Sequence, residues 1–231
     1  MDDKIDFYAT YDEFKSYATP VLKRKHMRQF DREFWRPTAC SAAMAMLEIG
    51  CGTGLFLCYL KEKGVTDLLG VDHNPELVRH LPPAVSGNFV NADVRQFVAD
   101  GNGGRRFHRI AMFDVLEHFT PDEGVRLLRG LNGFLAPGGR VVARVPNVAS
   151  PWGVQVQFGD LTHKTPFTPG SMRQLALAAG FTCTACLPQV RGHWSRRAMD
   201  RLLHGLLSRL LITAPEVWTA NMIAVLEPKP A

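Results

Sequence analysis

The segment LEIGCGTG, residues 47–54, is the most informative stretch of the chain. It ends a short apolar run that has the length and the glycine boundary of a buried strand, and a helical pattern over residues 55–63 follows it directly. Gly50, Gly52 and Gly54 allow a tight turn and a close approach of the backbone to a ligand. A strand that passes through a glycine loop into a helix predicts a ligand site at the end of that strand.

Strands alternate with helices along the rest of the chain. This order predicts one α/β domain with a doubly wound, seven-stranded, mostly parallel sheet that is covered by helices on both faces. Thr120 followed by Pro121 marks a helix start. We expect strands at residues 44–49, 68–71, 88–91, 109–113, 140–145, 181–187 and 219–226, and helices at 55–63, from Pro75, from Pro121 to near Gly133, and at 171–179.

Acidic residues close three successive strands, at Asp72, Asp93 and Asp114. Ligands of such sheets bind at the carboxyl ends of the strands. A dinucleotide fingerprint would need glycine three residues after Gly52, where the chain has Leu55, and no P-loop follows either. Carboxylates around the loop suit a cationic ligand with a diol better than a pyrophosphate.

These pieces together resemble the signatures of class I S-adenosylmethionine methyltransferases, in order and in spacing. The resemblance covers roughly residues 44–226 and implies the Rossmann-like methyltransferase fold, with S-adenosyl-L-methionine as cofactor. It implies that Asp72 accepts hydrogen bonds from both ribose hydroxyls, that Asp93 holds the adenine amino group, and that Asp114 lies beside the methionine part. The cofactor residues that we predict are Glu48, Gly50, Gly52, Gly54, Asp72, Asp93 and Asp114.

The stretch FGDLTHKTPFT, residues 158–168, contains the candidate catalytic residues. It resembles methyltransferases encoded with bacterial polysaccharide genes and, less closely, the ubiquinone O-methyltransferases. A hydroxyl acceptor needs a base, and histidine is the usual one near neutral pH. We predict His163 as this base and Asp160 as the group that orients its ring, with a loop-bracing role for His163 as the alternative. We expect His118 to have a cofactor-side or a structural role.

We expect an O-methyltransferase of a sugar or glycan intermediate of cell-surface polysaccharide biosynthesis. Methylation of a quinone precursor or another small metabolite is the alternative within enzymes, and a non-catalytic binding partner is the alternative outside them. A net charge of +5 and the absence of an Asn-Pro-Pro-Tyr motif after the fourth strand argue against nucleic acid. We expect no metal, because no cluster of carboxylates is visible on the acceptor side.

Three segments lie outside the predicted core. Residues 1–43 are expected to form a helical lid, residues 146–170 a long loop, and residues 188–218 a helical insertion within the methyltransferase domain 44–231. The insertion contains a basic amphipathic helix at 195–213, which either packs on the sheet edge or a second subunit, or meets an anionic membrane.

The chain shows neither an apolar signal core nor a stretch of membrane-spanning length, so we expect a cytoplasmic protein, free or peripheral to the inner face of the membrane. Cys183 and Cys186 form a C-x-x-C pair within a predicted strand. Residues three apart on a regular strand point to opposite faces, so we expect no shared metal and no redox pair.

Overall fold

The structure is a computed structural model that describes residue 7 and residues 16–230. Within these residues the sheet has seven strands in the order β3-β2-β1-β4-β5-β7-β6. The first part of the predicted lid, residues 1–6 and 8–15, lies outside the described residues. The strands are β1 (Met46–Ile49), β2 (Leu68–Asp72), β3 (Phe89–Asn91), β4 (Phe107–Phe113), β5 (Leu135–Pro146), β6 (Phe181–Pro188) and β7 (Asn221–Pro228).

The sheet is parallel from β3 to β5, and β7 lies antiparallel between β5 and β6. Ile49 at the end of β1 pairs with Val71 of β2 on one side and with Met112 of β4 on the other. The residues after these three strands therefore meet at one edge of the sheet. The predicted doubly wound, mostly parallel fold is confirmed.

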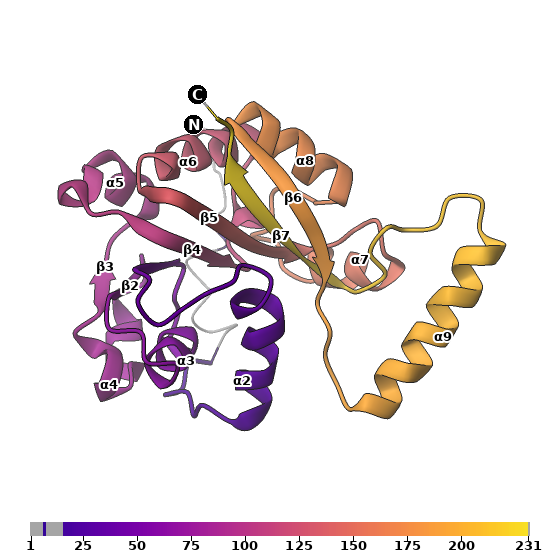
Figure 1. Cartoon of the computed structure of the whole chain (residues 1–231), viewed down its shortest axis with the longest axis horizontal. Helices are drawn as coiled ribbons and strands as arrows, with labels where there is room; N and C mark the ends of the chain where they lie inside the picture. The colour runs from indigo at the N-terminus through magenta and orange to yellow at the C-terminus, as the bar shows by residue number, and fades with distance from the viewer. Residues whose placement is uncertain (1–6, 8–15, 231) are drawn as a thin grey trace.

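Helices cover both faces of the sheet, with α5, α6 and α8 on one side and α2, α3 and α4 on the other (Figure 1). Each side has its own hydrophobic core, one around Leu128 and Met172 and the other around Phe30 and Phe56. Thr120 caps α6 as expected, and with Glu123 it also forms a capping box. The helices of this core are α2 (Arg24–Phe30), continued by the π-helical turn η2 (Asp31–Trp35), α3 (Leu55–Glu62), η3 (Pro75–His80), α4 (Pro83–Ser86), α5 (Val94–Ala99), η4 (Gly101–Gly104), η5 (Leu116–His118), α6 (Pro121–Asn132) and α8 (Pro169–Ala178).

The segment expected to be a long loop, residues 146–170, contains the helix α7 (Pro151–Phe158). Ser150 caps this helix by accepting a hydrogen bond from the Trp152 N–H, and Pro151 occupies its first position. A serine followed by proline is a helix-start signal. The prediction of an irregular loop is therefore wrong for these eight residues.

The prediction that Cys183 and Cys186 face opposite sides of β6 is also wrong. The register of β6 against β7 shifts between Cys183 and Ala185, which leaves Thr184 as an extra residue. A β-bulge of this kind reverses the alternation of side chains beyond it. The two sulfur atoms consequently lie 3.6 Å apart, both as free thiols.

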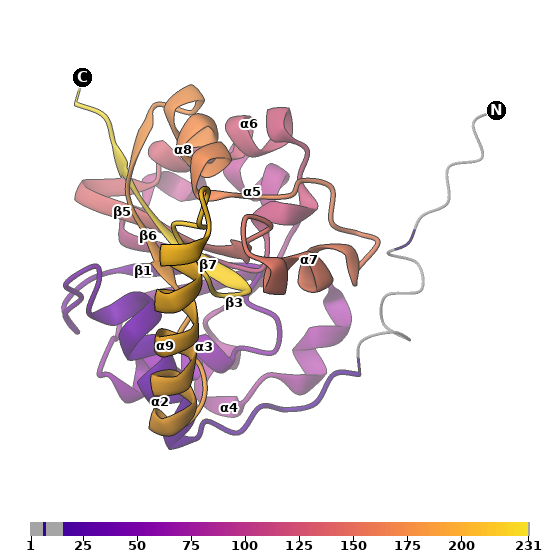
Figure 2. The ribbon, with the colours of Figure 1, turned by 90° about the vertical axis from the view of Figure 1, so that its right-hand side faces the viewer.

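Helix α9 (Trp194–Leu210) stands away from the body of the molecule as an arm that is joined at both ends (Figures 1 and 2). None of its residues is buried. It contacts the rest of the chain through His204, whose ring stacks on Trp218 with 5.0 Å between the ring centres, and through Ser208, which accepts a hydrogen bond of 2.9 Å from the Trp218 indole. Packing of this helix on the sheet edge or on a second subunit remains a prediction. In the described part of the chain, no helix has the length and apolar character needed to cross a membrane.

Candidate functional site

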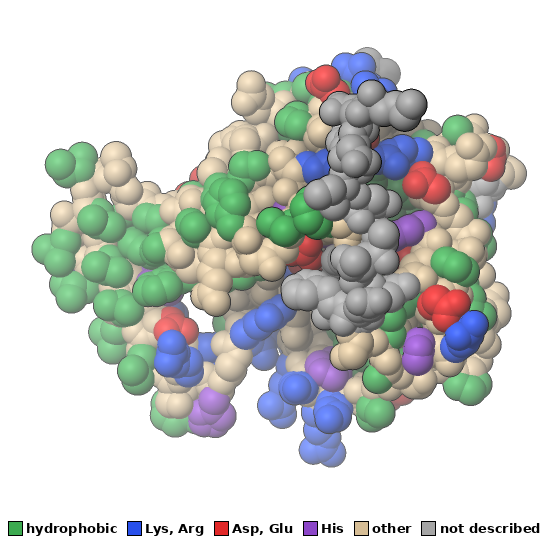
Figure 3. All heavy atoms as spheres, turned by 180° about the vertical axis from the view of Figure 1, so that it is seen from behind, with side chains coloured by type: hydrophobic (Ala, Val, Ile, Leu, Met, Phe, Trp, Pro, Cys, Tyr) green, Lys and Arg blue, Asp and Glu red, His purple; other side chains and the backbone are tan. Residues whose placement is uncertain are grey.

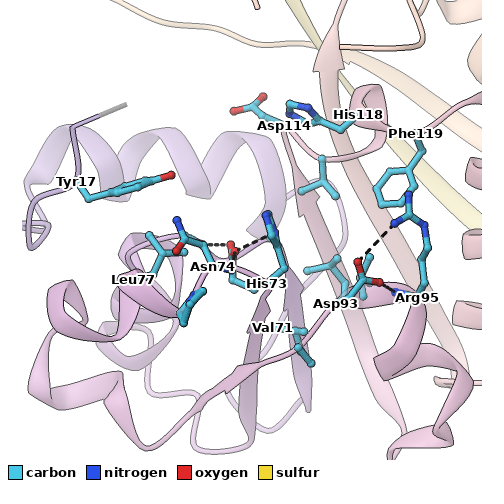
Figure 4. A pocket seen from close by; sticks show the side chains of 18 of the residues that line it. Tyr17, Val71, His73, Asn74, Leu77, Asp93, Arg95, Asp114, His118 and Phe119 are labelled. Atoms are coloured by element: carbon cyan, nitrogen blue, oxygen red, sulfur yellow. Dashed lines mark hydrogen bonds and ion pairs between the residues drawn. The ribbon is translucent and has the colours of Figure 1, made fainter. Parts of the chain in front are cut away.

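A pocket of about 760 Å³ opens at the carboxyl ends of β1, β2 and β4. Five of the seven predicted cofactor residues line it, and Figure 4 shows the two acids Asp93 and Asp114 on different sides of the space. Glu48 and Gly54 are outside the lining. The five lining residues are Gly50, Gly52, Asp72, Asp93 and Asp114.

The three loop glycines serve different purposes. Gly52 has a φ of +52°, and a Cβ atom built there would meet nothing within 4 Å, so it would project into open space beside the pocket. A Cβ at Gly50 would lie 2.4 Å from a methyl group of Val115, so this glycine is required by packing. Gly54 caps α3 in the left-handed conformation and faces Leu81, away from the ligand.

Asp72 holds the glycine loop in place. One of its carboxylate oxygens accepts a hydrogen bond of 2.9 Å from the Gly52 N–H, and the other accepts one of 3.2 Å from the Asn74 N–H. The carboxylate therefore fixes the loop and lies at the pocket wall, where the predicted bonds to a ribose diol would form.

Asp93 occupies the N-cap of α5 and accepts a hydrogen bond of 2.7 Å from the Arg95 N–H. The Arg95 side chain in turn pairs with Asp93 and with Glu123 of α6 (Figure 4 shows the first of these pairs). The predicted adenine-binding acid is thus also a helix cap, and an arginine stands next to it at the pocket.

Arg144 is a residue of this site that the sequence analysis did not identify. Its guanidinium binds both carboxylate oxygens of Asp114, at 2.9 and 2.5 Å, and a Glu33 oxygen at 3.1 Å. Burial opposes the charge of Arg144, but the two acids raise its pKa overall. The charge of Arg144 within an apolar predicted strand, residues 140–145, was the sequence signal that could have indicated a role for it.

Glu48 is buried next to the pocket rather than in its wall. Burial raises its pKa well above the usual range, with Arg144 acting in the opposite direction. One of its carboxylate oxygens has no hydrogen-bond partner among the described residues. Glu48 therefore does not line the pocket, and its part in cofactor binding remains a prediction.

His163 and Asp160 do not line the pocket, and their arrangement differs from the predicted one. The Nδ1 atom of His163 is 2.9 Å from the backbone carbonyl oxygen of Gln157, so a main-chain group orients the ring. The Asp160 carboxylate lies 4.0 Å from Nε2, the opposite nitrogen. This geometry aims the Nε2 lone pair of His163 toward the same space that Asp160 faces.

His118 adjoins the cofactor pocket and contacts His163, with the two rings edge to face and 4.7 Å between their centres. Its Nδ1 is 3.0 Å from the Thr162 hydroxyl oxygen, and that hydroxyl donates to Asp160 at 2.5 Å. Burial and the neighbouring His163 lower the pKa of His118 to about 4, so this ring is neutral near pH 7. Two imidazoles and a carboxylate therefore meet at the border of the pocket.

Glu117 is the second site residue to which the sequence analysis gave no role. It is only 1% exposed, and neither of its carboxylate oxygens has a hydrogen-bond partner within the described residues. Burial, and next the charge of Asp114, raise its pKa well above the usual range. In the sequence, Glu117 stands between a buried strand and His118. This position indicates the cofactor-side motif but gives no separate role to the Glu117 carboxylate.

The N-terminal segment reaches the pocket through Tyr17, whose side chain lines it (Figure 4). The helix α2 packs instead on the body, with the Phe30 ring 5.0 Å from Phe56 and 5.1 Å from Tyr59 of α3. The described part of the predicted lid thus contains the anchored helix α2 with its continuation η2, and residues 16–23, which have no regular secondary structure and lead to the pocket. The lid role of this segment remains a prediction.

Solved structures with this fold are known. The chain is similar to a SAM-dependent methyltransferase from Archaeoglobus fulgidus, with a TM-score of 0.65, 19% identity, and 96% of this chain and 99% of that chain covered. It is also similar to CalO1, a methyltransferase in calicheamicin biosynthesis in its SAH-bound form, with a TM-score of 0.55, 17% identity, and 87% and 54% coverage. The mitomycin 7-O-methyltransferase MmcR is similar with a TM-score of 0.58 and 14% identity, and the match covers 86% of this chain and 54% of that chain.

No curated protein sequence matches the chain significantly. A family model described as a methyltransferase domain, however, matches residues 14–185, which is most of the chain. That range includes the glycine loop, the three strand-end acids and the His163 segment. The chain therefore belongs to the methyltransferase-domain family.

Proposed function

We propose that this enzyme transfers a methyl group to a hydroxyl of a sugar or glycan intermediate in cell-surface polysaccharide biosynthesis. The observation that carries the choice of oxygen is the cluster of His118, His163 and Asp160, in which His118 lines the cofactor pocket and contacts His163. An amine or thiol acceptor has less need of such a cluster, whereas a hydroxyl is a poor nucleophile until its proton is removed.

S-adenosyl-L-methionine is the cofactor of this methyltransferase, and it supplies a methyl group activated on a sulfonium cation. The pocket suits such a ligand, because three carboxylates line it, those of Asp72, Asp93 and Asp114, against two cations, Arg95 and Lys164. The open space above Gly52 leaves room for close approach to the backbone.

The chain's own residues then have two tasks. They hold the acceptor oxygen in line with the methyl carbon, and they remove the proton that the oxygen loses as the new C–O bond forms and the C–S bond breaks. We assign both tasks to the cluster of His118, His163 and Asp160. The carbonyl of Gln157 and the hydroxyl of Thr162 fix the two rings, so the cluster is organised before the acceptor binds.

Two features support a sugar acceptor. The segment of residues 158–168 resembles enzymes encoded with polysaccharide genes. A second cavity of about 1060 Å³ lies between α7, α9 and the ends of β6 and β7, and its walls include Trp152 and Trp218 together with the cations Arg197 and Arg201. Indole rings and guanidinium groups suit a glycan with anionic substituents.

We also propose that α9 brings the enzyme to an anionic membrane that carries lipid-linked acceptors. Leucines at positions 202, 206 and 210 are 76%, 54% and 69% exposed, and Ile212 is fully exposed. Figure 3 shows these apolar side chains gathered over the arm. Four arginines of α9 against one aspartate, Asp200, give the helix the charge that anionic lipids attract.

The proposed function is tested with the full chain and labelled S-adenosyl-L-methionine, offered a panel of free sugars, nucleotide sugars, lipid-linked sugars and quinone precursors. We expect label on a sugar hydroxyl and little label on the quinones. Preferred labelling of a quinone would move the assignment to the small-metabolite alternative. Tight cofactor binding with no transfer to any acceptor in the panel would support the non-catalytic alternative.

A further inference from the structure

Glu117, His118 and His163 come together from two distant parts of the chain. The first two belong to η5 after β4, and His163 lies in the segment after α7. One possible ligand atom from each residue lies within 4.8 Å of the others. Two imidazole nitrogens and one carboxylate oxygen at such distances can bind a single metal ion.

The protein compensates the Glu117 carboxylate only weakly. Its side chain is almost completely buried, and within the described residues both of its oxygens lack a hydrogen-bond donor. The backbone around it is well bonded, because the Glu117 carbonyl accepts from the N–H groups of Lys164 and Thr165. A buried carboxyl group without a partner is costly and rare in folded proteins, and a bound proton or a bound ion accounts for it. The two imidazole rings within reach of Glu117 favour the ion.

The cations near this carboxylate are committed to other acids. All three nitrogens of the Arg144 guanidinium bind Asp114 or Glu33. The Lys164 ammonium lies 3.7 Å from Glu123 and is largely in solvent. Neither side chain therefore neutralises Glu117 by direct contact.

The two rings are held as metal-binding histidines are held. A carbonyl oxygen can only accept, so the contact with Gln157 places a hydrogen on Nδ1 of His163. The Thr162 hydroxyl gives its hydrogen to Asp160, so its oxygen accepts the Nδ1–H of His118. Both rings thus carry their lone pair at Nε2, and each is oriented by an outer partner, as in known metal sites.

We propose that Glu117, His118 and His163 bind one divalent transition-metal ion, with Asp160 next to it as a further oxygen ligand or as the acceptor of a proton from a bound water. Two imidazoles with carboxylate oxygens favour Zn²⁺, Co²⁺, Mn²⁺ or Fe²⁺ over Mg²⁺, which prefers an all-oxygen set. This proposal replaces our expectation of no metal. That expectation considered only clusters of carboxylates, whereas this set combines a carboxylate with two histidines, one of which is distant in sequence.

The location gives the ion a role if the proposed function holds. His118 lines the cofactor pocket, so the ion would lie at the border between cofactor and acceptor. An ion with open positions there would bind the acceptor hydroxyl and lower its pKa. His163 would then act on the acceptor as a ligand of the ion. The binding of the ion itself does not depend on the identity of the acceptor, so the two proposals can fail separately.

The test uses the full chain after treatment with a chelator and removal of that chelator. Co²⁺, Zn²⁺ and Mg²⁺ are titrated separately by calorimetry, the visible absorption of Co²⁺ is recorded, and the melting temperature is measured with and without each ion. We expect one Co²⁺ or Zn²⁺ per chain, a Co²⁺ spectrum typical of nitrogen and oxygen ligands, a rise in melting temperature, and binding of Mg²⁺ at least about a hundredfold weaker.

Glu117→Gln keeps the shape of the side chain and removes its charge, and His163→Ala removes one ring. We expect each to weaken Co²⁺ binding at least about tenfold and to abolish the thermal shift. Glu123→Gln and His193→Ala are the matched controls outside the cluster, and both should bind as the wild type does. Wild type without a bound ion at millimolar Co²⁺ or Zn²⁺, or binding that survives both cluster substitutions, would overturn the proposal.

Discussion

Replacing Gly52 by alanine separates the ligand role of the glycine loop from its structural role. The φ of +52° makes any side chain there strained, and the left-handed conformation costs a non-glycine residue about 1–2 kcal/mol. For a chain of this size, that loss lowers the melting temperature by about 2–4 °C per kcal/mol. The new Cβ meets no protein atom within 4 Å, so no steric clash within the protein adds to this cost.

Gly180, between α8 and β6, is the matched control. It has a φ of +86°, a Cβ there would also meet nothing within 4 Å, and it lines neither cavity. We expect Gly180→Ala and Gly52→Ala to lower the melting temperature by similar amounts. Only Gly52→Ala should weaken S-adenosyl-L-methionine binding, at least about tenfold or 1.4 kcal/mol, because its methyl group occupies space that the ligand needs.

Titration calorimetry of both variants, with melting curves measured in parallel, checks this prediction. Normal cofactor affinity in Gly52→Ala, together with the melting shift that the control shows, would refute the reasoning. The glycine would then serve the turn alone, and the pocket would lose its strongest link to the cofactor.

Three further predictions concern the acids, the acceptor cluster and the arm. Asp72→Ala should weaken cofactor binding at least about tenfold, since it removes a charged acceptor and also frees the Gly52 N–H; unchanged affinity in calorimetry would contradict this. His163→Ala should lower turnover by about 10²–10⁴-fold with an unchanged cofactor dissociation constant, and near-normal turnover would remove it from the mechanism. The wild type should sediment with anionic vesicles at low salt and be released at high salt. The double change Leu206→Ser and Leu210→Ser should abolish this sedimentation, and Leu177→Ser, at an exposed leucine on α8, should leave it unchanged. Dimerisation that depends on α9, without vesicle binding, would instead indicate a second copy of the chain as the partner of this helix.

The fold was predictable from the sequence because the signals that define it are local. Short apolar runs, glycines at turns and the Thr120 cap each depend on a few neighbouring residues, and all of them point to alternating strands and helices. The strand-end acids Asp72, Asp93 and Asp114 could be placed for the same reason, because parallel strands bring their carboxyl ends to one edge.

What could not be predicted depends on contacts between distant residues or on one-residue irregularities. The extra residue Thr184 places the two cysteines together, and no pattern in the sequence announces a bulge there. Glu117 and His163 meet only because the segment after α7 folds back, with Lys164 donating to the Glu117 carbonyl. Glu48 and Gly54 were predicted to line the pocket, but they do not. Glu48 is buried beside it, and Gly54 packs against Leu81, and both positions depend on contacts that the sequence does not show.

The central claim is that this methyltransferase modifies a sugar hydroxyl. A single-turnover reaction with S-adenosyl-L-methionine labelled at its methyl carbon, on a lipid-linked sugar acceptor, tests it most directly when the product is examined by mass spectrometry and carbon NMR. We predict a mass increase of one methylene unit on the sugar, a labelled carbon at the chemical shift of a methyl ether, and loss of this product with His163→Ala. A labelled methyl group on nitrogen, sulfur or carbon, or on an acceptor other than a sugar, would contradict the claim.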